Sequence, residues 1–169
     1  FPENDEFSLG MLGMHGTRYA NYAISEADLI IAAGARFDDR ITGNVSEFAP
    51  YVKIIHLDID PSAISKSVRV DIPIVGDAKD ILSQLIALAE KGRKRQAWHA
   101  KIEEWKSRYP LKYQTGGDLK PQYVVEKIDE VTKGKAIIAT EVGQNQMWAA
   151  QFYQYTKPRT FISSGGLGT

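Results

Sequence analysis

The chain has 169 residues, enough for one domain or for one domain and part of a second, and 43% of its residues are apolar. Its 21 basic residues balance its 21 acidic residues, which gives no charge-based reason to expect binding to nucleic acid or to an anionic membrane. The absence of cysteine excludes disulfides and thiolate metal sites, and no apolar run approaches the ~20 residues of a membrane-spanning helix. We therefore expect a cytoplasmic protein that binds neither nucleic acid nor membrane.

The first part of the chain alternates between helical patterns and short apolar runs. Residues 17–27 follow a glycine-rich loop and have the apolar spacing of a helix, with Thr17 as its predicted N-cap. Residues 28–33 are a continuous apolar run that ends at Gly34, which is typical of a strand buried on both faces. Two further strands are predicted at 52–60 and 72–77.

Helical patterns dominate the middle of the chain. Residues 78–92 place five apolar side chains on one helical face and end in a glycine. The charged stretch 91–110 predicts an exposed helix that packs one stripe against a domain, formed by Trp98, Ile102 and Trp105. Both tryptophans are interpreted as packing residues rather than cofactor contacts.

The order of these elements predicts the fold class and the domain organisation. Strands that alternate with helices indicate an α/β fold, here a Rossmann-like parallel sheet with three αβα layers over residues 1–93. Residues 94–120 are interpreted as a helical linker, because glycine and proline punctuate their end. A second α/β domain is predicted over 121–169, with helices at 121–132 and 145–153 and strands at 135–140 and 160–164. The glycine-rich end of the sequence leads us to expect a longer protein.

Acidic and glycine residues follow each strand of the first domain, in 34–40, 56–60 and 76–78. Ligands of open α/β sheets bind beyond the carboxyl ends of the strands. A carboxylate there suits ribose hydroxyls, and glycine lets the backbone approach a phosphate. The pattern predicts a nucleotide site, although the glycines of 9–16 lack the GxGxxG spacing and support it only weakly.

Structural roles compete with this interpretation at individual positions. Gly34 could simply end a strand, and Asp58 or Asp60 could cap the following turn. His15 has the alternative of a partly buried core histidine. The four charged residues within 36–40 could form solvated ion pairs worth about 0–1 kcal/mol each.

Several stretches together resemble the catalytic subunit of acetolactate synthase, a thiamine diphosphate enzyme. They cover nearly the whole chain: 12–44, 56–61, 76–79, 120–153 and 163–169. The resemblance implies that residues 1–93 belong to the central FAD-binding domain of that family. It also implies that residues 121–169 begin its C-terminal thiamine-diphosphate-binding domain.

The resemblance implies an activity and a set of cofactors. The family condenses pyruvate with a second 2-ketoacid, either pyruvate or 2-ketobutyrate, with loss of carbon dioxide, in branched-chain amino-acid biosynthesis. It uses thiamine diphosphate, Mg²⁺ and an FAD that takes no net redox part. Two alternatives stay open: a segment of another FAD-containing thiamine diphosphate enzyme, such as a pyruvate oxidase or glyoxylate carboligase, and a non-catalytic nucleotide-binding module.

The resemblance also implies roles for individual residues. The implied FAD contacts are Leu12, Gly13, Met14, His15, Gly34, Ala35, Arg36, Phe37, Asp38, Asp58, Ile59, Asp77 and Ala78, and the implied thiamine diphosphate contacts are Gln144, Asn145, Gly168 and Thr169. Arg40 is the implied catalytic residue, because its planar guanidinium suits the carboxylate of the acceptor ketoacid. The family usually has histidine where this chain has Asn145, and an asparagine cannot carry a proton near neutral pH.

Parts of the family's machinery lie outside this sequence. The glutamate that activates the thiamine cofactor and the GDG…N motif that binds Mg²⁺ are absent, so we predict no metal ligands here and expect the chain alone to be inactive. The resemblance implies a homo-oligomer, dimer or tetramer, that also binds a regulatory small subunit.

Overall fold

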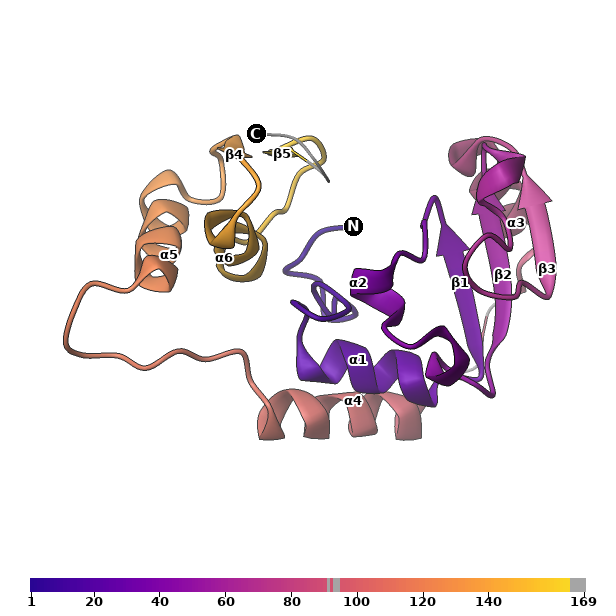
Figure 1. Ribbon diagram of the computed structural model, residues 1–169, viewed down its shortest axis with the longest axis horizontal. Helices are drawn as coiled ribbons and strands as arrows, with labels where there is room; N and C mark the ends of the chain where they lie inside the picture. The colour runs from indigo at the N-terminus through magenta and orange to yellow at the C-terminus, as the bar shows by residue number, and fades with distance from the viewer. Residues whose placement is uncertain (91, 93–94, 165–169) are drawn as a thin grey trace. The chain divides into compact units, whose positions relative to one another are not determined.

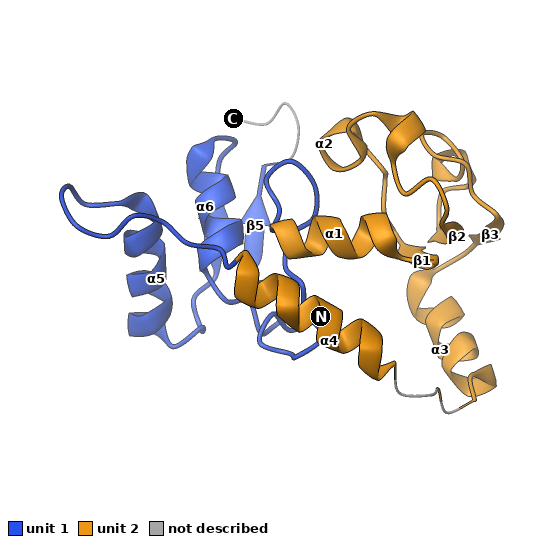
Figure 2. Ribbon diagram, turned by 90° about the horizontal axis from the view of Figure 1, so that it is seen from below, with its two compact units in different colours: residues 1–17, 110–169 blue, residues 18–109 orange. Residues whose placement is uncertain are grey.

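The structure is a computed structural model, which describes residues 1–90, 92 and 95–164 (Figure 1). The chain forms two compact units (Figure 2). Unit 1 comprises Phe1–Thr17 and Pro110–Thr169, and unit 2 comprises Arg18–Tyr109. Among the described residues, no helix combines the length and the apolar character needed to cross a membrane.

Unit 2 contains a three-stranded parallel sheet, in the order β1 (Leu29–Ala33), β2 (Lys53–Asp58) and β3 (Ile72–Val75). Residues Ile31, Ile55 and Ile72 lie side by side across the three strands. The predicted α/β class with a parallel sheet is therefore confirmed. Because the strands are parallel, their carboxyl ends lie at one edge of the sheet.

One buried cluster of unit 2 lies on one face of this sheet. Ala32, Phe37, Ile54 and Val68 form this cluster. The prediction that residues 28–33 are buried on both faces is wrong for the described residues, because Ile31 is 54% exposed. Successive side chains of a strand point to opposite faces, and β1 is an edge strand, whereas β2 lies between two strands and also packs against α3.

The helices of unit 2 are α1 (Arg18–Glu26), α2 (Asp39–Thr42), α3 (Ala78–Leu88) and α4 (Gln96–Arg108), with 3-10 turns at Val45–Glu47 and Pro61–Ala63. Helix α4 packs against α1 through Trp105, whose ring centroid lies 5.7 Å from that of Tyr22, which confirms a packing role for the aromatic stripe. Helix α3 ends at Leu88, four residues before its predicted end at Gly92. At this observed end, the N–H of Ala89 donates to the Leu85 carbonyl.

Unit 1 contains α5 (Pro121–Thr132), β4 (Ile138–Thr140), α6 (Gln144–Phe152) and β5 (Phe161–Ser163), and its two strands pair in parallel. Pro at the first position of α5 suits a helix start, where no N–H bond is lost. The first residues of the chain join this unit, because the N–H of Glu3 donates to the Tyr155 carbonyl and its carboxylate accepts from the Tyr155 N–H, each at 3.0 Å. The four elements match their predicted order.

Candidate cofactor-binding site

The chain turns sharply where β1 ends. Gly34 has a φ of +63°, a left-handed conformation that favours glycine, and its N–H donates to the Leu57 carbonyl of β2 at 2.8 Å. Gly34 thus ends the strand, which was the structural interpretation of this glycine. Its backbone also lies at the sheet edge. Three residues later Phe37 returns to the core with a φ of +51° and lies edge-on to His56, with ring centroids 5.2 Å apart.

The four charged residues after β1 form two ion pairs. Arg36 Nη2 lies 3.1 Å from Asp38 Oδ2, and Arg40 Nη1 lies 2.9 Å from Asp39 Oδ2. Both arginine side chains are largely exposed, so each pair contributes about 0–1 kcal/mol. The four residues therefore form the solvated ion pairs that were the alternative to a ligand site.

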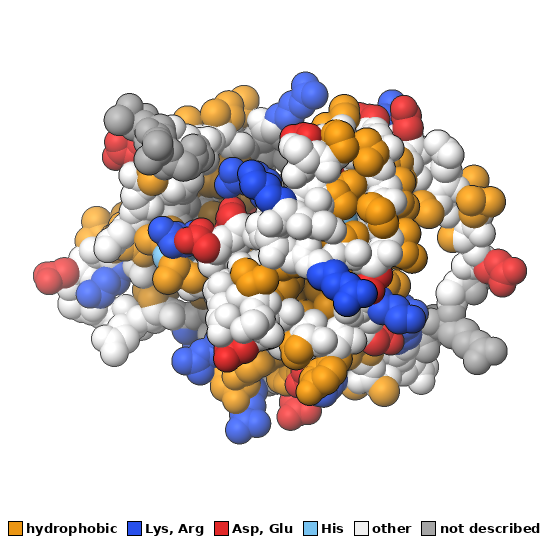
Figure 3. All heavy atoms as spheres, turned by 45° about the vertical axis from the view of Figure 1, so that its right-hand side comes forward, with side chains coloured by type: hydrophobic (Ala, Val, Ile, Leu, Met, Phe, Trp, Pro, Cys, Tyr) orange, Lys and Arg blue, Asp and Glu red, His pale blue; other side chains and the backbone are white. Residues whose placement is uncertain are grey.

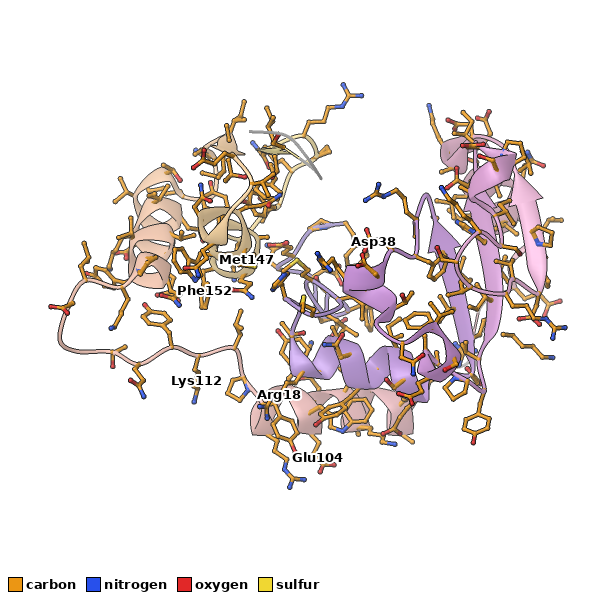
Figure 4. The ribbon with its side chains drawn as sticks, viewed as in Figure 1. Arg18, Asp38, Glu104, Lys112, Met147 and Phe152 are labelled. Carbon is orange, nitrogen blue, oxygen red and sulfur yellow. The ribbon has the colours of Figure 1, made fainter. Side chains whose placement is uncertain are left out.

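Two features of this segment exceed what ion pairs explain. Asp38, beside α2 in Figure 4, has one carboxylate oxygen, Oδ1, that is buried and without a hydrogen-bond partner among the described residues. Among the described residues, Arg40 forms one side-chain hydrogen bond, from Nη1 to Asp39 Oδ2, whereas a guanidinium carries five N–H donors. The remaining donors of Arg40 are available to a carboxylate ligand.

The end of β2 carries two carboxylates with different partners. Asp58 Oδ1 accepts the N–H of Asp60 at 2.9 Å, and Asp60 Oδ1 accepts the N–H of Ser62 at 2.8 Å. The Ser62 hydroxyl and N–H hold the pKa of Asp60 below its ordinary value. Asp60 is therefore the turn cap. Ile59, between the two carboxylates, is mostly exposed.

The end of β3 leads directly into a helix. Asp77 caps α3, because its Oδ1 accepts the N–H groups of Lys79 and Asp80 at 2.9 and 3.2 Å. Ala78 is the first helical residue. The capping role explains Asp77 without a ligand, while its position beside the β2 end keeps it among the candidate contacts.

The structure brings the three strand ends of unit 2 together. The N–H of Gly34 donates to the carbonyl of Leu57, and the N–H of Gly76 donates to the carbonyl of Asp58 at 2.9 Å. Gly34–Asp38, Asp58–Ile59 and Asp77–Ala78 therefore follow neighbouring strands at one sheet edge. This is the edge at which open α/β sheets bind nucleotides.

The implied FAD loop, Leu12–His15, belongs to unit 1. It closes on itself through hydrogen bonds from Gly16 N–H to the Gly13 carbonyl and from Thr17 N–H to the Met11 carbonyl, each at 2.9 Å. Met14 and His15 are exposed, so the alternative of His15 as a core histidine is wrong. The His15 carbonyl accepts from Gln151 Nε2 at 2.7 Å, which ties the loop to α6.

The implied thiamine diphosphate contacts lie at the N-terminus of α6. Gln144 and Asn145 are exposed there, directly after the turn that follows β4, and the N-cap residue Gly143 has no side chain that could accept from the first N–H groups. The N–H groups and the partial positive charge of a helix N-terminus suit an anion such as a diphosphate. Gly168 and Thr169 lie outside the described residues.

A polar network beside α6 escaped the sequence interpretation. Gln146 Nε2 donates to Ser163 Oγ at 2.5 Å and to the Ser164 carbonyl at 3.2 Å, and Thr140 Oγ1 donates to the same Ser163 oxygen at 2.9 Å. The network fixes the start of α6 to the ends of β4 and β5. The polar residues at the ends of both strands are the sequence feature from which this network could have been predicted.

Charge and metal-binding groups are dispersed. Basic and acidic side chains are interspersed over the face seen in Figure 3. Within residues 1–90, 92 and 95–164, no three His, Cys, Asp or Glu side chains gather in a way that would hold a metal ion.

Comparisons with known proteins place these features in a family. A model of the thiamine pyrophosphate enzyme central domain matches residues 1–85, and a model of the C-terminal TPP binding domain of such enzymes matches residues 141–169. The chain is 50% identical, over 99% of its length, to "Acetolactate synthase 1, chloroplastic" of Oryza sativa subsp. japonica. It is 49% identical, over its full length, to "Acetolactate synthase large subunit" of Haemophilus influenzae.

The chain spans 27% of the rice protein and 30% of the Haemophilus protein. The central-domain match alone covers half of the chain. With the parallel sheet and the strand-end residues described above, this match shows that the chain belongs to the thiamine pyrophosphate enzyme family.

Proposed function

We propose that this chain is part of an acetolactate synthase, which condenses pyruvate with pyruvate or 2-ketobutyrate and releases carbon dioxide. The observation that carries the proposal is the 49–50% identity to acetolactate synthases over 99–100% of the chain. In this proposal residues 1–93 belong to the FAD-binding domain, 94–120 to a linker and 121–169 to the thiamine diphosphate domain. The enzyme is a cytoplasmic homo-oligomer with a regulatory subunit, whereas the plant relatives are named chloroplastic.

The sheet edge of unit 2 has the chemistry to hold FAD. The Asp58 carboxylate offers lone pairs to ribose hydroxyls, because Asp60 N–H occupies only one of its sites. Gly34 and Gly76, without side chains, let the nucleotide approach the backbone. The buried, unpaired Asp38 Oδ1 is an acceptor that a ligand donor would satisfy.

The start of α6 has the chemistry to hold the diphosphate of thiamine diphosphate. The N-cap residue Gly143 provides no side-chain cap, and Gln144 and Asn145 add amide donors at the same place. When bound, thiamine diphosphate supplies the electron sink for decarboxylation of a 2-ketoacid. Asn145 contributes hydrogen bonds but no proton transfer near neutral pH.

Arg40 is proposed to bind the carboxylate of the acceptor ketoacid. Its side chain is 68% exposed and engages Asp39 through one nitrogen, so a bidentate pair with an incoming carboxylate requires no buried interaction to break. Asp39 then serves to orient the guanidinium. Mg²⁺ ligands are expected outside this chain.

The proposal is tested on the full-length enzyme with pyruvate, thiamine diphosphate, Mg²⁺ and FAD. We expect acetolactate to form without net reduction of the flavin. Flavin reduction by pyruvate, coupled to an acetyl product, would instead favour a pyruvate oxidase. Failure to form either product would favour a non-catalytic nucleotide-binding module.

The FAD assignment has its own experiment. Replacing Asp58 by lysine puts a cation where a carboxylate is placed for ribose hydroxyls, so the Asp58→Lys enzyme should lose FAD on gel filtration. Lys53→Ala, at the opposite end of the same strand, is the matched control and should retain it. Equal retention by both variants would show that Asp58 does not hold FAD.

A further inference from the structure

His56 is a buried histidine without a hydrogen-bond partner. It lies in the middle of the sheet with 0% exposure, and neither Nδ1 nor Nε2 has a hydrogen-bond partner among the described residues. Its neighbours across the sheet are Ala32 and Pro73, which offer no polar side chain. Leaving buried polar atoms unpaired is costly, so their presence in a core calls for an explanation.

The carboxylate of Asp58 lies close to the imidazole. Nε2 of His56 lies 3.7 Å from Asp58 Oδ2. This distance is longer than the roughly 2.7–3.2 Å of an N–H···O hydrogen bond. The two residues are two positions apart in β2, so their side chains lie on the same face of the sheet. The Asp58 side chain is 12% exposed, and its other oxygen accepts the Asp60 N–H. A hydrogen bond between the two side chains requires them to approach by about 0.5–1 Å.

The ring of Phe37 also packs against the imidazole. Its ring lies edge-on to His56 at 89°, and its φ of +51° is uncommon for a residue with a side chain. Phe37 belongs to the segment after β1 that is proposed to contact FAD, whereas His56 and Asp58 belong to β2. The imidazole therefore lies beside both the segment after β1 and the carboxylate at the end of β2.

We infer that His56 is a positioning residue for the nucleotide site: when FAD binds, its Nε2–H donates to the Asp58 carboxylate and fixes it in the orientation that accepts the two ribose hydroxyls of FAD. A carboxylate has about four lone-pair sites. The Asp60 N–H takes one, His56 takes a second, and two remain for a vicinal diol. This inference rests on the proposed function, since it takes FAD as the ligand of Asp58.

Three variants of the full-length enzyme test the inference. His56→Leu removes both polar nitrogens and keeps an apolar side chain. His56→Gln places an amide nitrogen near the position of Nε2, whereas His56→Asn places one near Nδ1, too far from Asp58. The affinity for FAD is measured by flavin fluorescence titration, and the stability of the FAD-free protein by urea unfolding.

We expect His56→Leu and His56→Asn to weaken FAD binding by roughly tenfold or more, the effect of losing a hydrogen bond to a charged group. We expect His56→Gln to stay within about threefold of the wild type, by retaining that bond. The FAD-free His56→Leu protein should be at least as stable as the wild type, because it no longer buries unpaired polar atoms. Affinity and stability therefore change in different directions.

Two results would overturn the inference while leaving the proposed function intact. One is FAD binding by His56→Leu as tight as that of the wild type. The other is an equal loss of FAD affinity and of stability in His56→Leu and His56→Gln, which would assign His56 a packing role. A wild-type enzyme that binds no FAD would overturn the proposed flavin site and the inference with it.

Discussion

Gly16 closes the loop that carries Leu12–His15, and its replacement by alanine should open that loop. A Cβ at position 16 would lie 2.2 Å from the Met11 carbonyl oxygen and 2.6 Å from the Leu12 carbonyl carbon. Both are backbone atoms, so no side-chain rotation relieves the overlap. The chain must move apart at this point.

The size of the effect follows from the bonds that hold the loop. Opening it breaks the Thr17 N–H bond to Met11 and the Gly16 N–H bond to Gly13, and it displaces the buried Thr17 hydroxyl from the Leu9 carbonyl, 3.0 Å away. At 0.5–1.5 kcal/mol net for each hydrogen bond, Gly16→Ala should cost about 1.5–4.5 kcal/mol. Gly34→Ala is the matched comparison.

At Gly34 an added Cβ meets no atom within 4 Å, but the φ of +63° remains unfavourable for alanine. That strain alone costs about 1–2 kcal/mol. Urea unfolding of both variants of the full-length enzyme, with amide hydrogen exchange at Thr17, distinguishes the two causes. We expect faster exchange at Thr17 in Gly16→Ala only. A smaller loss of stability in Gly16→Ala than in Gly34→Ala, with exchange at Thr17 unchanged, would refute the reasoning.

Three further predictions concern single side chains. Arg40→Ala should slow acetolactate formation by roughly tenfold to a hundredfold, because about 1.5–3 kcal/mol of charge-assisted pairing is lost. Single-turnover release of carbon dioxide from the first pyruvate should stay near normal. Equal slowing of both steps would contradict the role of Arg40 in binding the acceptor. Ser62→Ala should raise the pKa of Asp60 toward 3.8, because the Ser62 hydroxyl lowers it in the wild type, and carboxyl NMR titration measures this change. In the wild type, the stability that the lowered pKa contributes is present above pH 3.8 and is lost as the pH falls through the lowered pKa. An unchanged titration of Asp60 in Ser62→Ala would exclude the hydroxyl as the cause. Glu126→Gln should lower the pKa of Tyr113 from about 12 toward 10, because the hydrogen bond to the Glu126 carboxylate raises it; NMR titration of the Tyr113 ring checks this, and a pKa that stays near 12 would be inconsistent with it.

The sequence by itself determined the order and type of the main elements. The helix predicted at 121–132 has the bounds of α5, and the acidic and glycine residues after each strand predicted the sheet edge that the structure assembles. Helix periodicity, glycine turns and caps act over a few neighbouring residues, so a single sequence contains them. The resemblance to acetolactate synthases was likewise readable from consecutive residues.

Only the tertiary structure decided which faces are buried and which polar groups lack partners. Ile31 is predicted to be a core residue but is exposed, and its strand lies at the edge of the sheet. His56 is unpaired because its neighbours come from two other strands, and Gln146 bonds Ser163 across 17 positions of the chain. Burial and pairing depend on segments distant in sequence that folding brings together, and a local pattern carries no information on which segment will arrive beside it.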